Sequence, residues 1–174
     1  MDELSRRRLV LAADEERQQI ERELHDGPQQ DLVALIVNLQ LARRKAGANP
    51  LLDEIARDAQ RALDALRKLS ARLSPPLAGA AGLAAALRST ADGPVEVHVD
   101  LSEACPAEIL RAAYFCCVGL HGTSVRVHEE DAALVFEVAG VDPEQDVTRV
   151  RDRVEALGGE LTHGPAGVTG RLPL

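Results

Sequence analysis

Residues 16–41 read ERQQIERELHDGPQQDLVALIVNLQL, and this stretch decides the fold of the first half of the chain. Its leucines and isoleucines recur at helical spacing, which is typical of an amphipathic helix: Ile20, Leu24, Leu32, Leu35, Ile36 and Leu39. Pro28 lies inside this pattern, where it removes one helix hydrogen bond and crowds the carbonyl of Leu24. Because the apolar period resumes at once, the pattern predicts one helix over residues 2–46 with a kink directly after His25.

A second helix is predicted over residues 51–73, after the short connection Gly47-Ala48-Asn49-Pro50. Its apolar residues alternate spacings of three and four, which indicates a heptad seam: Leu52, Ile55, Ala59, Ala62, Leu66, Leu69 and Leu73. Two long helices with so short a connection must be antiparallel neighbours. One hairpin buries little apolar surface, so we expect a homodimer in which two hairpins form a four-helix bundle.

The second half of the chain mixes helical and strand patterns. Ser74-Pro75-Pro76 ends the second helix, because proline disfavours helical conformation in the residue before it. Beyond it we predict helices over residues 82–91, 106–118 and 145–157, and strands over residues 95–100, 124–129, 133–139, 160–163 and 167–172. The predicted fold class is α+β, with helices on one face of a small mixed sheet. We expect two domains, residues 1–76 and residues 77–174.

Composition excludes several classes of protein. Aromatic residues make up 2% of the chain, so the core must be built from Leu, Val, Ile and Ala. The net charge of −8 argues against a nucleic-acid binder, which would need a basic face. Three cysteines, with Cys116 and Cys117 adjacent, favour a reducing, cytoplasmic compartment. The charged N-terminus and the short, punctuated apolar runs predict neither a signal peptide nor a membrane span.

The stretch around His25 resembles the dimerisation and phosphoacceptor helix of bacterial sensor histidine kinases, in particular the subfamily that includes nitrate sensors. The family pattern is R-I-x-R-E-L-H-D-x-x-x-Q-x-L, and the matching residues are Ile20, Arg22, Glu23, Leu24, His25, Asp26, Gln30 and Leu32. Gln19 stands where an arginine is usual. Three later segments also resemble the family, namely LSPPL at 73–77, GLAAAL at 82–87 and RDRVEALGGEL at 151–161. The resemblance therefore covers most of the chain.

This resemblance implies a chemical role for three residues. His25 would accept a phosphoryl group on a ring nitrogen and exchange it with an aspartate of a response-regulator receiver domain. Asp26 would orient the imidazole or take its proton. Gln30 would position a water for dephosphorylation of the partner. Asp26 and Gln30 are four residues apart, which places both on one face of a regular helix.

The second domain departs from the family pattern where ATP should bind. The family's nucleotide helix carries Glu and Asn in E-A-L-x-N, but residues 112–127 here read AAYFCCVGLHGTSVRV. The D-D-G-x-G motif is also missing, since residues 137–150 read EVAGVDPEQDVTRV and Asp142 is out of place. Without the Asn no Mg²⁺ site is expected, and the charge on a transferring phosphoryl group is then poorly neutralised. We therefore expect a degenerate ATPase-like domain that uses neither ATP nor Mg²⁺ as a cofactor.

Other polar residues have simpler interpretations. Cys117 and His121 are four residues apart, but two ligands do not close a zinc site, so we expect a buried cysteine and no metal. His98 and His128 alternate with valines on strands and are expected to face solvent.

Three functions are consistent with these patterns. The leading hypothesis is a dimeric two-component phosphotransfer or phosphatase protein that exchanges phosphate with a response regulator through His25, without its own ATP binding. The second is an ATP-dependent histidine autokinase with a divergent nucleotide site. The third is a non-catalytic pseudokinase scaffold that binds a regulator or a full-length histidine kinase.

Overall fold

The computed structural model describes residues 3–47, 49–75, 77–91 and 93–174. Asp2, where the first helix was expected to begin, and Pro76, at the expected domain boundary, lie outside the described residues. The chain divides into two compact units. The hairpin unit is Glu15–Ser74, and the sheet unit combines the residues up to Asp14 with Pro75–Leu174.

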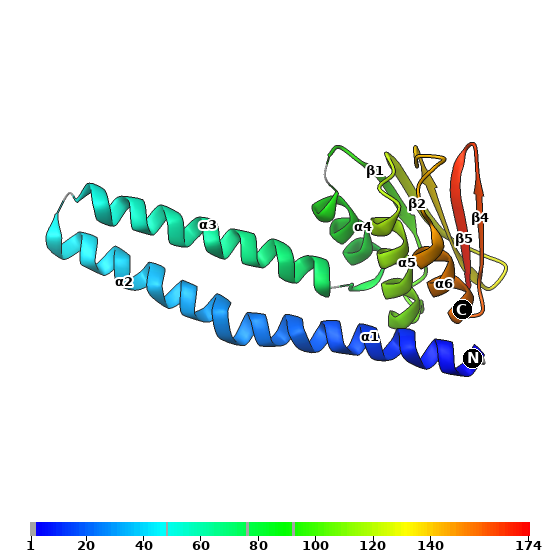
Figure 1. Ribbon diagram of the computed structural model, residues 1–174, viewed down its shortest axis with the longest axis horizontal. Coiled ribbons are helices and arrows are strands. Elements are labelled where there is room, and N and C mark those ends of the chain that lie inside the picture. The colour runs from blue at the N-terminus through cyan, green and yellow to red at the C-terminus, as the bar shows by residue number, and fades with distance from the viewer. Residues whose placement is uncertain (1–2, 48, 76, 92) are drawn as a thin grey trace. The chain divides into compact units, whose positions relative to one another are not determined.

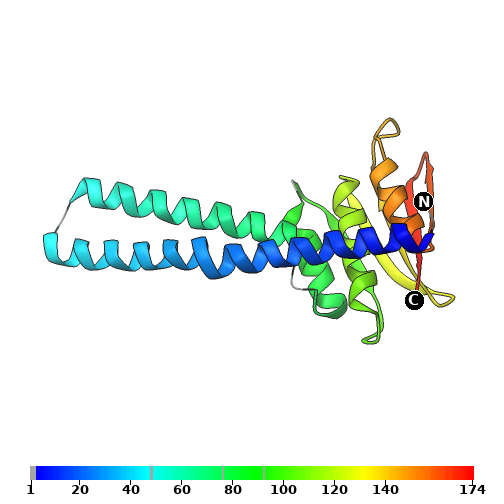
Figure 2. The same ribbon diagram turned by 60° about the horizontal axis from the view of Figure 1, so that its bottom comes forward.

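Four consecutive helical segments form the hairpin unit, and the first of them begins in the sheet unit. α1 spans Glu3–Leu24, a π-helical turn (η1) spans His25–Gln29, α2 spans Gln30–Ala46 and α3 spans Pro50–Leu73. α3 runs back beside α2, as Figures 1 and 2 show. The predicted helical hairpin is thus confirmed, and the kink predicted directly after His25 takes the form of a π-helical turn that begins at His25.

Residues of the connection between α2 and α3 cap the end of α2 and the beginning of α3. The Asn49 side-chain oxygen accepts hydrogen bonds from the backbone N–H groups of Leu51 and Leu52, at 3.1 and 3.4 Å. Pro50 is the first residue of α3, where a helix needs no N–H donor. Gly47 follows α2 with a φ of 73°, a conformation that favours glycine. These residues reverse the chain sharply enough to keep the two helices adjacent.

The face that α3 turns toward α2 differs from the predicted seam. Leu63 and Ser70 are buried, whereas Ile55 and Leu69 of the predicted seam are exposed. Ala59 is buried as expected. The difference arises because α3 carries two adjacent apolar stripes, and only one of them can face α2 within a single chain.

The sheet unit contains five strands in one mixed sheet. The strands are β1 Glu96–Asp100, β2 Ser124–Glu130, β3 Ala133–Ala139, β4 Glu160–Gly164 and β5 Gly167–Pro173. Their order across the sheet is β1-β2-β3-β5-β4. β1 pairs with β2 in parallel, and all other neighbours are antiparallel. The predicted α+β class and all five predicted strands are confirmed.

Three helices of the sheet unit lie on one face of the sheet (Figure 1): α4 Gly79–Thr90, α5 Ala107–Gly119 and α6 Thr148–Ala156. α4 begins three residues before its predicted start. α6 begins three residues after its predicted start, because Asp142 and Asp146 form local turns ahead of it. Hydrogen bonds from the Thr148 side chain and, at 2.9 Å, from the Thr148 backbone N–H lower the pKa of the Asp146 carboxyl, and the second satisfies a donor of the first helical turn.

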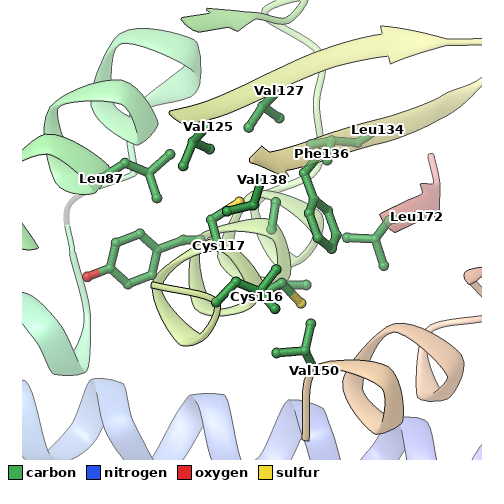
Figure 3. Close-up of a cluster of buried hydrophobic side chains, with 14 of the residues drawn as sticks. Leu87, Cys116, Cys117, Val125, Val127, Leu134, Phe136, Val138, Val150 and Leu172 are labelled. Carbon is green, nitrogen blue, oxygen red and sulfur yellow. The ribbon is translucent and has the colours of Figure 1, made fainter. Parts of the chain in front are cut away.

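The core of the sheet unit lies between these helices and the inner face of the sheet. Figure 3 shows Cys116 and Cys117 of α5 among aliphatic side chains and Phe136. Alternate residues of β5 are buried, as period-two patterning requires, whereas the central strand β3 buries residues 133–136 in succession. Gly170 lies opposite Phe136 in the β3–β5 ladder, and a Cβ there would collide with the aromatic ring. The small residue therefore makes room for one of the largest side chains in the core.

Candidate functional site

His25 and Asp26 lie in the π-helical turn η1, and both side chains are exposed. Gln30 is the first residue of α2 and is also exposed. The structure thus places the three residues selected from the sequence within one short segment of the hairpin unit. A π-turn is wider than an α-helical turn, so the angular relation between Asp26 and Gln30 differs from that of a regular helix. Such turns occur frequently at functional sites.

The local sequence explains why the helix widens here. Pro28 has no N–H, so it cannot bond to the carbonyl four residues earlier, as an α-helix demands. A π-turn pairs each carbonyl with the N–H five residues later, which passes over the missing donor. Gly27 has open space around it, since nothing lies within 4 Å of a Cβ built there. The helix therefore continues through this turn although Pro28 cannot donate its α-helical hydrogen bond.

A buried hydrogen bond anchors this turn to the second helix of the hairpin. The Gln29 side-chain nitrogen donates to the Ser70 hydroxyl oxygen at 2.8 Å. Gln29 is 7% exposed and Ser70 is 5% exposed. Sequence reasoning did not select either residue. The available signal was Ser70 itself, a polar residue seven positions after Leu63 on the buried side of α3.

The sheet-unit residues at which the sequence departs from the expected nucleotide motifs are core and turn residues. Cys117 on α5 is 3% exposed, and burial raises its pKa. Asp142 accepts a hydrogen bond from the Glu144 N–H at 2.9 Å, as an ordinary turn residue does. The Gln145 amide donates to the Gly119 carbonyl at 2.8 Å and ties the loop before α6 to the end of α5.

A second buried polar cluster lies inside the sheet unit. Two guanidinium nitrogens of Arg153 donate to the two carboxylate oxygens of Asp14, at 2.8 and 2.9 Å. The Arg153 guanidinium carbon also lies 4.9 Å from the centroid of the Phe115 ring. Arg7 and Glu108 form a further, more exposed ion pair at 2.8 Å. The first residues of α1 are thereby bound to α5 and α6, a connection that sequence reasoning missed.

The two strand histidines have different environments. His98 is exposed and pairs with Glu96 at 2.9 Å, as expected for a solvent-facing residue. His128 corrects the expectation, because its side chain is only partly exposed and its Nδ1 atom is buried without a hydrogen-bond partner among the described residues. Both histidines line an open depression of about 400 Å³ on the sheet, together with Asp100 and Arg126.

Within residues 3–47, 49–75, 77–91 and 93–174, no group of three or more His, Cys, Asp or Glu side chains is arranged to hold a metal ion. Cys117 is buried, as expected for a small apolar residue. Among the described helices, none combines the length and the hydropathy that crossing a bilayer requires.

Comparison with known proteins gives one family match and one curated relative. Residues 16–78 match the histidine kinase family HisKA_3. Over 83 residues, the chain is 37% identical to the oxygen sensor histidine kinase NreB of Staphylococcus carnosus (strain TM300). That match covers 46% of this chain and 24% of NreB, so the chain spans about a quarter of its relative's length.

Two solved structures resemble the chain at low sequence identity. The Acinetobacter baumannii histidine kinase AdeS is 13% identical with a TM-score of 0.36, covering 83% of this chain and 95% of that chain. A bacterial phosphotransferase is 14% identical with a TM-score of 0.40, covering 93% of this chain and 94% of that chain.

Proposed function

We propose that His25 is a phosphoacceptor, on the basis of the match between residues 16–78 and the histidine kinase family HisKA_3. This match and the similarity to NreB support a role in two-component signalling. The observation that carries the proposal is the exposed His25–Asp26 pair in the π-turn of the matched region. An exposed imidazole presents a ring nitrogen to a docking protein without displacing a covering side chain.

The proposed reaction exchanges a phosphoryl group between His25 and an aspartate of a response-regulator receiver domain. A ring nitrogen of His25 attacks the phosphorus of the aspartyl phosphate, the N–P bond forms, and the O–P bond to the aspartate breaks. The aspartate carboxylate is the leaving group, and the reverse reaction returns the phosphoryl group to it. Asp26 accepts the proton of the other ring nitrogen or orients it by hydrogen bonding. Gln30 orients a water when hydrolysis replaces transfer.

We further propose that the sheet unit does not charge His25 from ATP. Three observations in the corresponding region support this. Cys117 lies in the apolar core, Asp142 is used in a turn, and Gln145 fixes the intervening loop to Gly119. A phosphoryl transfer from ATP would need carboxylate or amide ligands for Mg²⁺ at that place.

A homodimer is the proposed assembly of the hairpin unit. α2 exposes Val33, Val37 and Leu41, which follow one another at four-residue spacing and so form a continuous apolar stripe. α3 adds exposed Ile55 and Leu69. Two such hairpins would bury these stripes against one another in a four-helix bundle.

Phosphotransfer from receiver domains tests the proposal directly. Receiver domains phosphorylated with radiolabelled acetyl phosphate are mixed with the chain, and transfer of label is followed on gels. We expect label on the wild type that is stable to alkali and labile to acid, as phosphohistidine is. The His25→Ala variant should take no label, whereas the control His98→Ala, an exposed histidine of the sheet unit, should behave as the wild type does.

The two alternatives give different results. Strong labelling of His25 from radiolabelled ATP and Mg²⁺ would favour an autokinase and overturn the proposed route. Binding of a receiver domain that proceeds equally well with His25→Ala, with no transfer in either protein, would favour a non-catalytic scaffold.

A further inference from the structure

We infer that Gln29 and Ser70 are positioning residues for His25, an inference that rests on the proposed function of that histidine. Gln29 ends the π-turn that begins with His25, and its amide donates to the Ser70 hydroxyl on α3 at 2.8 Å. Neither side chain faces solvent, whereas His25 and Asp26 do. The pair thus fixes one side of the turn to α3 while the other side stays open.

The polar character of this pair gives it a specificity that apolar packing lacks. Among the described residues of the hairpin unit, Gln29 and Ser70 are the buried polar side chains, and they bond to each other. If the turn slid or rotated against α3, both groups would be buried without partners, which is costly. A buried polar pair in an otherwise apolar helix interface therefore specifies a single register.

The position of the pair beside Pro28 explains why such an anchor is useful here. The regular α-helical ladder is interrupted in this turn, so backbone hydrogen bonds alone hold its register less firmly. A shift of the widened turn by one residue would rotate His25 and Asp26 away from their present direction. The hydrogen bond from Gln29 to Ser70 opposes that shift, because Gln29 is the last residue of the turn itself.

The amide and the hydroxyl carry no charge and do not titrate near neutral pH. They lie on the buried side of the turn and touch no reacting atom, so their contribution is geometric. Displacements of about 1 Å at a reacting group reduce rates by roughly a hundredfold in other enzymes, so a smaller change in average position still lowers the rate measurably.

Four variants separate positioning from simple stability. Gln29→Met together with Ser70→Ala replaces both polar groups by apolar ones, a change that is close to neutral for folding. Ser70→Ala alone removes one partner, and Ser70→Thr keeps the hydroxyl. Gln60→Met is the matched control, since Gln60 is an exposed glutamine on α3. Folding is checked by thermal melting.

Two readouts report on His25. Histidine-selective NMR gives the ring signals of the five histidines, and His25→Ala assigns the relevant one. Transfer from phosphorylated receiver domains gives the rate. We expect the double variant to split or broaden the His25 signal and to lower the transfer rate roughly tenfold or more. Ser70→Ala should do the same, whereas Ser70→Thr and Gln60→Met should keep a single His25 signal and the wild-type rate.

The outcomes distinguish this inference from the proposed function. A double variant with an unchanged His25 signal and an unchanged rate would overturn the positioning role. If the double variant does not fold, the comparison of Ser70→Ala with Ser70→Thr decides the question, and equal His25 signals in those two would count against the inference. If the wild type transfers no phosphate, the proposed function fails, while the NMR signals still test the positioning.

Discussion

At the scale of single residues, the effect of a glycine-to-alanine substitution on stability depends on the space around the added Cβ atom. Gly170 on β5 faces Phe136 on β3, and a methyl group there would meet the aromatic ring directly. Gly27 in the π-turn has nothing within 4 Å of its would-be Cβ. The same substitution at the two sites should therefore have opposite signs.

Gly170→Ala should lower the free energy of unfolding by about 1–3 kcal/mol, because an overpacked core must shift the ring or the strand. Gly27→Ala serves as the control and should raise it by up to about 1 kcal/mol through helix propensity. Chemical denaturation of both variants measures the difference. Equal effects at the two glycines would contradict the packing described for Phe136.

Cys116 gives a prediction about alkaline pH. Burial is the largest effect on this thiol and raises its pKa from 9.0 to about 12, with nearby Arg153 acting in the opposite direction. Between these two values the unfolded chain has lost the proton while the folded chain keeps it. The unfolded state then binds fewer protons, so stability must fall as the pH rises from about 9 toward 12.

Denaturation of the wild type at several pH values above 9 should show this loss, with a contribution from Cys116 of up to about 1.4 kcal/mol per pH unit. Cys116→Ala removes the titrating group and should flatten the slope by that amount, even though its stability at neutral pH is lower. A variant slope identical to that of the wild type would show that the buried thiol does not hold its proton in this range.

At the scale of elements, the first turns of α1 belong to the structure of the sheet unit. The Asp14 and Arg153 side chains are 7% and 13% exposed, and they are joined by two hydrogen bonds. Removing one member of such a pair leaves a buried charge uncompensated. The pair therefore holds α1 against α6 mainly because separating the two side chains would leave each charge buried without a partner. The net contribution of the intact pair to the free energy of unfolding is the smaller effect.

Asp14→Asn should destabilise the sheet unit by about 3 kcal/mol, because Arg153 loses its carboxylate partner in a buried place. The double variant Asp14→Leu with Arg153→Met replaces both charges by apolar side chains and should recover most of that loss. Thermal unfolding of the three proteins measures both effects. Asp14→Asn with the melting temperature of the wild type would contradict the burial of this pair.

The helices and strands could be predicted from local patterns, whereas the side-chain pairs that connect them could not. Period-two alternation at residues 95–100 and turn residues at 164–166 located strands, because those signals lie within a few residues. The Gln29–Ser70 and Asp14–Arg153 pairs join residues 41 and 139 positions apart. Nothing in either local sequence identifies its partner, so such pairs emerge only from the tertiary structure.

The candidate site shows the same division. His25, Asp26 and Gln30 were selected from their motif, and the structure leaves all three exposed. The presence of Pro28 predicted an irregular turn at this place but not its widened, π-helical form. A kink was expected there, and a π-turn is the specific geometry by which the helix continues.

At the scale of the whole molecule, the exposed apolar stripe of α2 should decide the oligomeric state. Val37 is 48% exposed in a single chain, so a charged residue is tolerated there by the isolated hairpin but not inside a bundle. Val37→Glu should halve the mass measured by sedimentation equilibrium. Leu174→Glu, at a similarly exposed leucine of the sheet unit, should leave the mass unchanged. A wild type that sediments as a monomer would rule out the proposed bundle.

The division of the chain into units also bears on the order in which the protein folds during synthesis. The hairpin unit is one continuous stretch, Glu15–Ser74, so all of its partners have left the ribosome by the time α3 is complete. The sheet unit needs Asp14 before the hairpin unit and Arg153 well after it, so its closure must await the synthesis of Arg153. Asp14 is thus made before the hairpin unit but meets its partner only after all residues of that unit have been synthesised.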